Sequence, residues 1–312
     1  MVSFALSRWE RFLHGEVGLK QSVVVRKLLR LIAVALLFAL MSMALATDQR
    51  VSTVPETVVV PSGKLSLKAF LWKPAGPGPF PAVLFCHGSG GADAGHTAGV
   101  PITEAAERLA PLFLRHGYAF LYLFRRGQGL SADQGEFMQN ILQREETAKR
   151  KEARQHLQFV LATTDHLDDV MAGLLFLKAA PGIDAKRIAI AGHSFGGQLT
   201  LLAAGRDNSV RAAVTFAAAA GSWERSFELR ERLLTAVNKA TAPIMLIQAA
   251  NDYGTAPGYA LANELERLRK PHLLKIYPPV GKTAEDGHGF LDLAMPQWED
   301  DVFRFLDEHV KR

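Results

Sequence analysis

Cysteine is almost absent from this sequence, and the common cofactor-binding motifs are missing as well. Cys86 is the only cysteine among 312 residues, so no disulfide bond can form within the chain. No His-Glu-x-x-His motif occurs, and His87 and His96 lack a credible set of further ligands, so we expect no metal site. No Gly-x-Gly-x-x-Gly motif or phosphate-binding loop follows the early apolar runs. We therefore expect no bound cofactor.

An excess of positive charge is confined to the beginning of the chain. The formal net charge is +5, and residues 1–46 contain six Lys and Arg but only two Glu. The remaining residues carry 30 basic and 29 acidic side chains and are nearly neutral. The basic character of the whole chain therefore does not predict a nucleic-acid partner.

Long apolar runs are also scarce, and the one near the N-terminus is short. Residues 31–46 form an apolar run that falls below the roughly 20 residues needed to cross a bilayer. A basic stretch precedes it at 26–30, and it ends in Ala-Leu-Ala. This pattern is typical of a cleaved signal peptide, and a retained membrane anchor is the alternative. We predict that residues 1–46 export the chain to the periplasm or the medium and that residues 47–312 form the folded domain. Contact with a membrane is expected only if residues 31–46 are retained.

Strand and helix patterns alternate along the rest of the chain. The expected strands are 57–60, 65–72, 82–86, 118–124, 187–192, 211–217, 243–249 and 272–277. The expected helices lie near 103–115, 165–179, 195–205, 223–239, 256–269 and 297–310. Strands separated by helices of this length favour an α/β fold, in which helices cover both faces of a mostly parallel sheet of about eight strands.

A charged segment at 136–160 interrupts this alternation. It lies within an expected small helical insertion near 133–163, and Glu precedes a basic residue by four positions twice, which supports an exposed helix. The segment is interpreted either as a solvated surface helix or as a partial lid over the functional site. The residues expected on the underside of such a lid are Ile141, Leu142, Leu157, Phe159 and Val160.

The stretch Gly192-His193-Ser194-Phe195-Gly196 contains the strongest functional signal. It fits the pattern Gly-x-Ser-x-Gly, follows an apolar strand and precedes a helix rich in Ala and Leu. The glycines are needed because side chains at these positions would collide with the backbone of the tight turn. The helix N-terminus favours developing negative charge beside the hydroxyl. We therefore predict that Ser194 is a nucleophile.

Other motifs extend this pattern over residues 56–312. In chain order they are CHGSGG at 86–91, RRGQGLS at 125–131, GHSFGG at 192–197, Asp252, and GHGF at 287–290. The chain resembles the α/β-hydrolase superfamily, and within it the dienelactone hydrolase-like esterases and their prolyl oligopeptidase-like relatives. The resemblance implies hydrolysis by a serine nucleophile. It says little about the substrate.

A serine nucleophile needs a base, and the base needs an orienting carboxylate. The chain order expected for this fold is serine, acid and then histidine. Asp252 follows the strand expected at 243–249 by three residues and is our predicted acid. A turn-forming aspartate is the alternative, and Glu224 or Glu228 would then be the acid.

Three histidines follow Asp252 in the sequence. His272 begins an expected strand and His309 lies in a charged terminal helix, whereas His288 lies between two glycines in the loop after the last strand. His288 is therefore the predicted base. Because it must be neutral to accept a proton, we expect the rate to fall in mild acid.

The oxyanion of the acyl intermediate needs preorganised N–H donors. The backbone N–H of Phe195, directly after the nucleophile, is one predicted donor. By resemblance the other comes from the loop after the strand at 82–86, with Ser89 preferred over Gly88 or Gly90. These assignments predict an oxyanion hole formed by Phe195 and Ser89.

Four further residues have simpler expected roles. Cys86 ends a buried strand and is expected to be a core residue, since the elbow holds serine where true dienelactone hydrolases use cysteine. His87 is expected to be a structural loop histidine. Arg125 and Arg126 are expected to brace the loop, as the arginine of the Arg-Gly pair does in the family, or alternatively to bind an acidic substrate group.

The sequence therefore predicts an exported serine hydrolase that cleaves small carboxylic esters through a Ser194-His288-Asp252 triad and an acyl-enzyme. A prolyl oligopeptidase-like peptidase and an acyltransferase use the same residues and are the alternatives. A binding protein that retains the fold without turnover is a further alternative, although such proteins commonly lose a member of the triad. No oligomeric state follows from the sequence.

Overall fold

A single mixed sheet organises the part of the chain that the structure describes. The structure is a computed structural model that describes residues 54–90, 96–97 and 100–312. The predicted signal peptide or anchor at 1–46 lies outside these residues. Within the described ranges no helix is long and apolar enough to cross a membrane.

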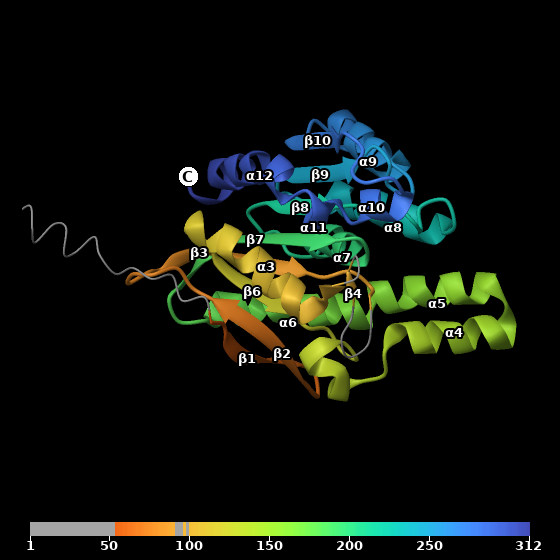
Figure 1. The fold of residues 1–312 in the computed structure, drawn as a ribbon, viewed down its shortest axis with the longest axis horizontal. Coiled ribbons are helices and arrows are strands. Elements are labelled where there is room, and N and C mark those ends of the chain that lie inside the picture. Colours follow the sequence, from red (N-terminus) through yellow and green to blue (C-terminus); the bar gives the residue numbers. More distant parts are fainter. Residues whose placement is uncertain (1–53, 91–95, 98–99) are drawn as a thin grey trace, which may run out of the picture. The chain divides into compact units, whose positions relative to one another are not determined.

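The sheet contains eight strands in the order β1-β2-β6-β3-β7-β8-β9-β10 (Figure 1). Strands β1, β2 and β6 pair antiparallel, and every other pair is parallel. The bounds are β1 Glu56–Ser62, β2 Leu65–Trp72, β3 Phe80–Cys86, β6 Ala119–Leu123, β7 Ile183–His193, β8 Ala213–Phe216, β9 Ile244–Ala249 and β10 His272–Tyr277. The predicted mostly parallel sheet of about eight strands is confirmed. A separate two-stranded ribbon, β4 His96–Thr97 with β5 Val100–Pro101, was not predicted.

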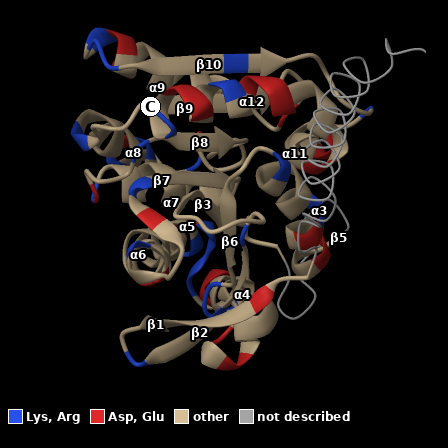
Figure 2. Ribbon diagram, turned by 90° about the vertical axis from the view of Figure 1, so that its left-hand side faces the viewer, with Lys and Arg blue, Asp and Glu red and all other residues tan. Residues whose placement is uncertain are grey.

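Helices cover both faces of this sheet. Helix α3 (Ile102–Arg115) and α12 (Met295–Val310) pack on one face. The other face carries α6 (Asp165–Ala179), α7 (Phe195–Ala204), α8 (Phe227–Lys239) and α9 (Ala256–Arg267). Figure 2 shows α6 and α8 on one side of the strands and α3 on the other. The predicted α/β architecture with two helical layers is therefore confirmed.

The strand sequences explain why two separate cores form. Successive side chains of a strand point to opposite faces. In β6, Ala119, Leu121 and Leu123 therefore enter the core beneath α6 and α7. Phe120 and Tyr122 enter the core beneath α3, where Phe113 stacks on Phe120 at a ring-centroid distance of 4.3 Å. One face is thus largely aliphatic and the other is rich in aromatic rings.

The predicted insertion consists of a short 3-10 helix η1 (Gly129–Gln134) followed by the hairpin of α4 (Met138–Lys149) and α5 (Lys151–Thr163). Figure 1 shows this hairpin projecting past the carboxyl ends of the parallel strands. Met138, Leu142 and Ala162 are buried in the aliphatic core and anchor it. The apolar residues of the hairpin thus attach it to the domain. Its polar residues lie at the surface beside the carboxyl ends of the strands.

Candidate active site

Ser194 lies in a sharp turn between β7 and α7, as the motif predicts. Its φ of +54° is rarely adopted by a residue with a side chain, and its backbone N–H donates to the carbonyl of Phe216 over 2.8 Å. A Cβ at Gly196 would lie 1.9 Å from the carbonyl oxygen of Cys86, and one at Gly192 would lie 2.4 Å from that of Gly196. Glycine is therefore required on both sides of the serine by direct steric exclusion.

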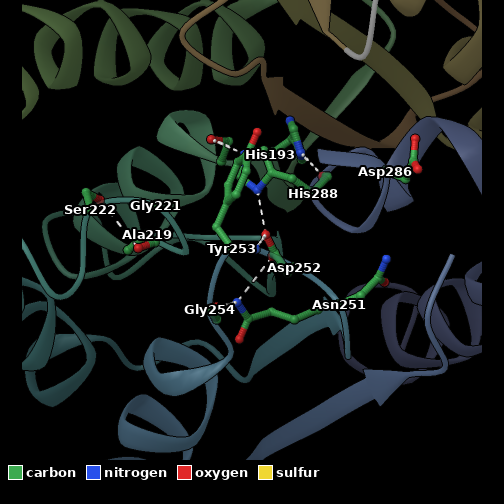
Figure 3. A network of polar contacts seen from close by, with 12 residues as sticks. His193, Ala219, Gly221, Ser222, Asn251, Asp252, Tyr253, Gly254, Asp286 and His288 are labelled. Carbon is green, nitrogen blue, oxygen red and sulfur yellow. Dashed lines mark hydrogen bonds and ion pairs between the residues drawn. The ribbon is translucent and has the colours of Figure 1, made fainter. Parts of the chain in front are cut away.

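The structure brings the three predicted triad residues into one hydrogen-bonded chain. Nε2 of His288 is 2.8 Å from Oγ of Ser194, and Nδ1 of the same ring is 2.8 Å from Oδ1 of Asp252. The Asp252 side chain is fully buried, and the backbone N–H of Tyr253 donates to its Oδ1 over 2.7 Å. Figure 3 shows His288 joined to Asp252 on one side and to His193 on another. This arrangement can relay a proton away from the serine hydroxyl.

Two loops that follow adjacent parallel strands hold this chain together. Asp252 comes after β9, and His288 ends the short helix α10 (Ala284–His288) after β10, where a loop was predicted. The side-chain amide of Asn251 donates to the carbonyls of Val280 (2.7 Å) and Thr283 (2.8 Å). These bonds fasten the segment that carries the histidine to the segment that carries the aspartate.

His193 is a site residue that the sequence motifs did not single out. The ring is buried, and its Nε2 lies 2.8 Å from the carbonyl oxygen of His288, to which it donates when neutral. Burial lowers the pKa of His193 from 6.5 to about 3, with a smaller contribution from the nearby His288. The ring is therefore neutral at physiological pH and fixes the backbone of His288 without adding charge. Its position inside the Gly-x-Ser-x-Gly motif was the only signal in the sequence.

The loop after β3 is held from behind by a buried arginine. Arg125 is fully buried and donates to the carbonyls of His87 (2.7 Å) and Gly88 (2.8 Å). In a trans peptide the N–H points opposite to the carbonyl, so the N–H of Ser89 points away from Arg125. Ser89 lines the cleft beside Ser194. Phe195 is the first residue of α7, and its N–H has no partner within that helix.

The two arginines of the RRGQGLS motif do not reach the cleft. Arg126 pairs with Asp169 over 2.8 Å and with Asp165 over 3.1 Å. Arg125 is enclosed beneath the loop and lies 5.4 Å from the ring centroid of Phe195. The bracing interpretation therefore agrees with the observed contacts, and the alternative of substrate binding does not.

The remaining residues considered from sequence take no part in the hydrogen-bonded chain of Ser194, His288 and Asp252. Burial raises the pKa of the Cys86 thiol from 9.0 to about 12, which keeps it a neutral core residue. His87 is buried, and desolvation together with Arg125 holds its pKa well below 6.5. Glu228 pairs with His156 over 2.9 Å, and the carboxylate of Glu224 lies 4.0 Å from Arg230. Neither fallback acid contacts His288.

A cleft of about 750 Å³ opens above Ser194 and His288. Its walls include Ser89, Tyr253 and Gln158, the last from α5. Of the five apolar residues expected beneath a lid, none lines this cleft, because the apolar side of the hairpin packs toward the domain. Within the part of the chain that the structure describes, no three His, Cys, Asp or Glu side chains are grouped to hold a metal ion.

Comparison with known proteins gives a match to a sequence family and matches to solved structures. The sequence model of the Dienelactone hydrolase family matches residues 67–297. No curated protein sequence shows a significant match. Among solved structures, Est1E from Butyrivibrio proteoclasticus with bound ferulic acid has a TM-score of 0.58 at 18% identity, covering 82% of this chain and 100% of that one. A putative dienelactone hydrolase from Klebsiella pneumoniae has a TM-score of 0.58 at 18% identity, covering 83% and 98%.

A larger enzyme shares the same fold over part of its length. Acylaminoacyl peptidase from Pyrococcus horikoshii has a TM-score of 0.56 at 18% identity, covering 83% of this chain but only 41% of the peptidase. Identities this low establish a common fold and leave the substrate open.

Proposed function

Because this chain belongs to the dienelactone hydrolase family and is thus a hydrolase of the α/β-hydrolase superfamily, we propose that it is an exported serine hydrolase of carboxylic esters. The observation that carries the proposal is the unbroken chain from Ser194 through His288 to Asp252, with 2.8 Å at each contact. The buried, hydrogen-bonded carboxylate at one end and the cleft-lining hydroxyl at the other are what acyl transfer requires.

In the proposed reaction, Oγ of Ser194 attacks the ester carbonyl carbon while Nε2 of His288 accepts the hydroxyl proton. Asp252 holds the ring and stabilises the resulting imidazolium. The backbone N–H groups of Phe195 and Ser89 stabilise the oxyanion. His288 then protonates the leaving alcohol, and a water molecule activated by the same ring hydrolyses the acyl-enzyme and restores Ser194.

One matched structure supports a carboxylic ester as the substrate. Est1E was solved with bound ferulic acid, and a carboxylic acid of this kind is what ester hydrolysis releases. Acylaminoacyl peptidase also matches, at the same identity of 18%, so the peptide alternative is tested directly. The peptidase and acyltransferase alternatives keep the same nucleophile and differ in the bond cleaved or the acceptor used. Export is proposed from residues 26–46 and is tested by determining the N-terminal sequence of the protein recovered from outside the cytoplasm.

The first experiment is hydrolysis of 4-nitrophenyl esters, from acetate to long acyl chains, by the full chain and its Ser194→Ala variant. Ser66→Ala, an exposed serine on β2, is the matched control. We expect turnover by the parent and the control and loss of at least about 10³-fold in Ser194→Ala. A fluorophosphonate should add to Ser194 alone, as detected by peptide mass spectrometry. Equal turnover by Ser194→Ala would refute the assigned nucleophile.

The same preparation distinguishes an esterase from an acyltransferase, a peptidase and a binding protein. An acyltransferase would form a new ester when an alcohol is added in competition with water, and a peptidase would release nitroaniline from acylaminoacyl anilides. A folded protein that neither turns over any of these substrates nor reacts with the fluorophosphonate would be a binding protein.

A further inference from the structure

A second cleft of about 480 Å³ continues from the catalytic cleft along the α4–α5 hairpin, and we call it the hairpin cleft. The two clefts share lining residues from the oxyanion loop, α5, α7 and the segment before α8. These residues are Ser89, Gln158, Gln198, Ser222 and Arg225. A substrate bound at Ser194 can therefore extend into the hairpin cleft without leaving the protein surface.

The walls of the hairpin cleft are polar. Gln139 and Gln143 on α4 and Gln155 on α5 line it, and Nε2 of Gln139 lies 3.4 Å from the carbonyl oxygen of Ser89. Of the described residues that line it, only Phe159 and Leu229 are apolar. An aliphatic chain placed there would bury little apolar surface and would desolvate amide groups, so the cleft disfavours long acyl chains.

The hairpin cleft also carries an excess of positive charge. Lys151, Arg154 and Arg225 line it, and Glu146 is the one carboxylate among its described lining residues. Arg154 lies 3.4 Å from Glu146 and is largely neutralised by it. Lys151 and Arg225 have no carboxylate partner among the described residues, and Arg225 donates only to the backbone carbonyl of Gly221, although the domain as a whole is nearly neutral. Two uncompensated cations thus face one polar cleft.

The catalytic cleft is the more negative of the two clefts. Two carboxylates, Glu224 and Glu285, and one cation, Arg225, line it, and neither of these carboxylates is among the residues lining the hairpin cleft. An anionic group on the substrate therefore meets net positive charge in the hairpin cleft and net negative charge in the catalytic cleft. This difference in charge orients an elongated substrate, because only one of its ends suits the hairpin cleft.

From this arrangement we propose that the hairpin cleft binds the anionic end of the substrate, so that the enzyme prefers esters bearing a carboxylate at a distance from the scissile bond. The proposal rests on the proposed esterase function and adds a substrate class to it. Arg225, which lines both clefts, and Lys151 supply the positive charge that recognises the carboxylate.

Two pairs of esters test the proposal. The first pair places the carboxylate on the acyl side of the scissile bond, and the second pair places it on the alcohol side. One pair is 4-nitrophenyl hydrogen glutarate and 4-nitrophenyl pentanoate, and the other is 4-acetoxybutyrate and butyl acetate. Proton release is followed for all four at low ionic strength and at 0.5 M salt. We expect the anionic member of at least one pair to have the higher kcat/KM, and this preference to shrink in salt because exposed charges are screened.

Charge-removing variants show which side chains cause the preference for anionic esters. Arg225→Gln and Lys151→Gln should each lower the anionic-to-neutral ratio of kcat/KM by up to about fivefold, the upper end of the range measured for exposed ion pairs. Lys186→Gln removes an equal charge near the opposite end of β7 and should leave the ratio unchanged. Calorimetric binding of the anionic ester to Ser194→Ala, with and without the Arg225→Gln change, measures recognition apart from turnover.

The outcomes separate the two proposals. A preference for neutral esters in both pairs, or an anionic preference that survives both charge-removing variants, would overturn the role of the hairpin cleft while leaving the esterase intact. If the parent protein hydrolyses none of the four esters, the esterase function is overturned. In that case, binding of the anionic ester to Ser194→Ala that depends on Arg225 would still support anion recognition, and its absence would refute it.

Discussion

Asp292 places a carboxyl group in the protein interior without a partner. The residue is 5% exposed, and neither carboxylate oxygen has a hydrogen-bond partner in the structure. It lies in α11 (Phe290–Leu293), shortly after His288, beside Tyr122 and His193 and with no space for a water molecule between them. Burial raises the pKa of Asp292 from 3.8 to about 6, and Arg108 opposes this only partly. The folded protein therefore binds the Asp292 proton more tightly than the unfolded chain does.

The sign of the pH dependence follows from this difference. At pH values well below about 4, the carboxyl is protonated in both states, so its ionisation does not affect the free energy of unfolding. As the pH rises from about 4 through about 6, the unfolded chain ionises more readily, so the free energy of unfolding falls. The rise of the Asp292 pKa from 3.8 to about 6 corresponds to ~3 kcal/mol. Asp292→Asn removes the ionisable group and should stabilise the protein by about that amount at pH 8, with little effect near pH 4.

Urea unfolding at several pH values measures this effect. For a domain of this size, ~3 kcal/mol corresponds to roughly 6–12 °C in Tm and to a clear rise in the urea midpoint at pH 8. Asp300→Asn, on the exposed side of α12, makes the same change in net charge and is the control. A stability difference that is independent of pH, or a destabilised Asp292→Asn protein at pH 8, would refute the reasoning.

Three further predictions follow from the site. Gly196→Ala should prevent the elbow from forming, because its Cβ would lie 1.9 Å from a carbonyl oxygen, and soluble yield with circular dichroism will test this. His193→Phe should lower kcat by about tenfold or more with a smaller change in KM, because the His288 carbonyl loses a buried donor. His193→Gln should retain part of the kcat that His193→Phe loses, because its side-chain amide can donate to the same carbonyl. Equal kinetics for the two variants would contradict a positioning role. Arg125→Met should lower kcat by about tenfold or more, because the carbonyls of His87 and Gly88 lose their donor. Steady-state kinetics, measured where the variant and the parent are equally folded, test this. An unchanged kcat would show that the loop after β3 does not depend on Arg125.

Local sequence signals carried much of the architecture and of the site. Continuous apolar runs marked the buried parallel strands, and the Gly-x-Ser-x-Gly turn marked Ser194. Chain order then singled out Asp252 and His288, which the structure brings within hydrogen-bonding distance. These features are predictable because each depends on a short segment and on the polarity of a parallel sheet.

Features that depend on contacts between distant segments were not predictable. His193 acts on a carbonyl 95 residues away, and no local pattern indicates that contact. The helix expected from residue 223 begins at Phe227, because the Ser226 hydroxyl accepts a hydrogen bond from the backbone N–H of Leu229 and caps it there. The lining of the clefts likewise depends on how the α4–α5 hairpin packs, which composition alone does not determine.

The attachment of the α4–α5 hairpin has a consequence for how the enzyme can diversify. The hairpin enters the aliphatic core through a few residues, including Met138 and Leu142, and its polar side lines the hairpin cleft. The three residues of the proposed triad all come from segments after residue 190. Exchange of residues 135–164 between relatives would therefore replace one wall of the cleft while leaving the Ser194-His288-Asp252 chain in place, so that the proposed specificity and the proposed chemistry belong to separate parts of one domain.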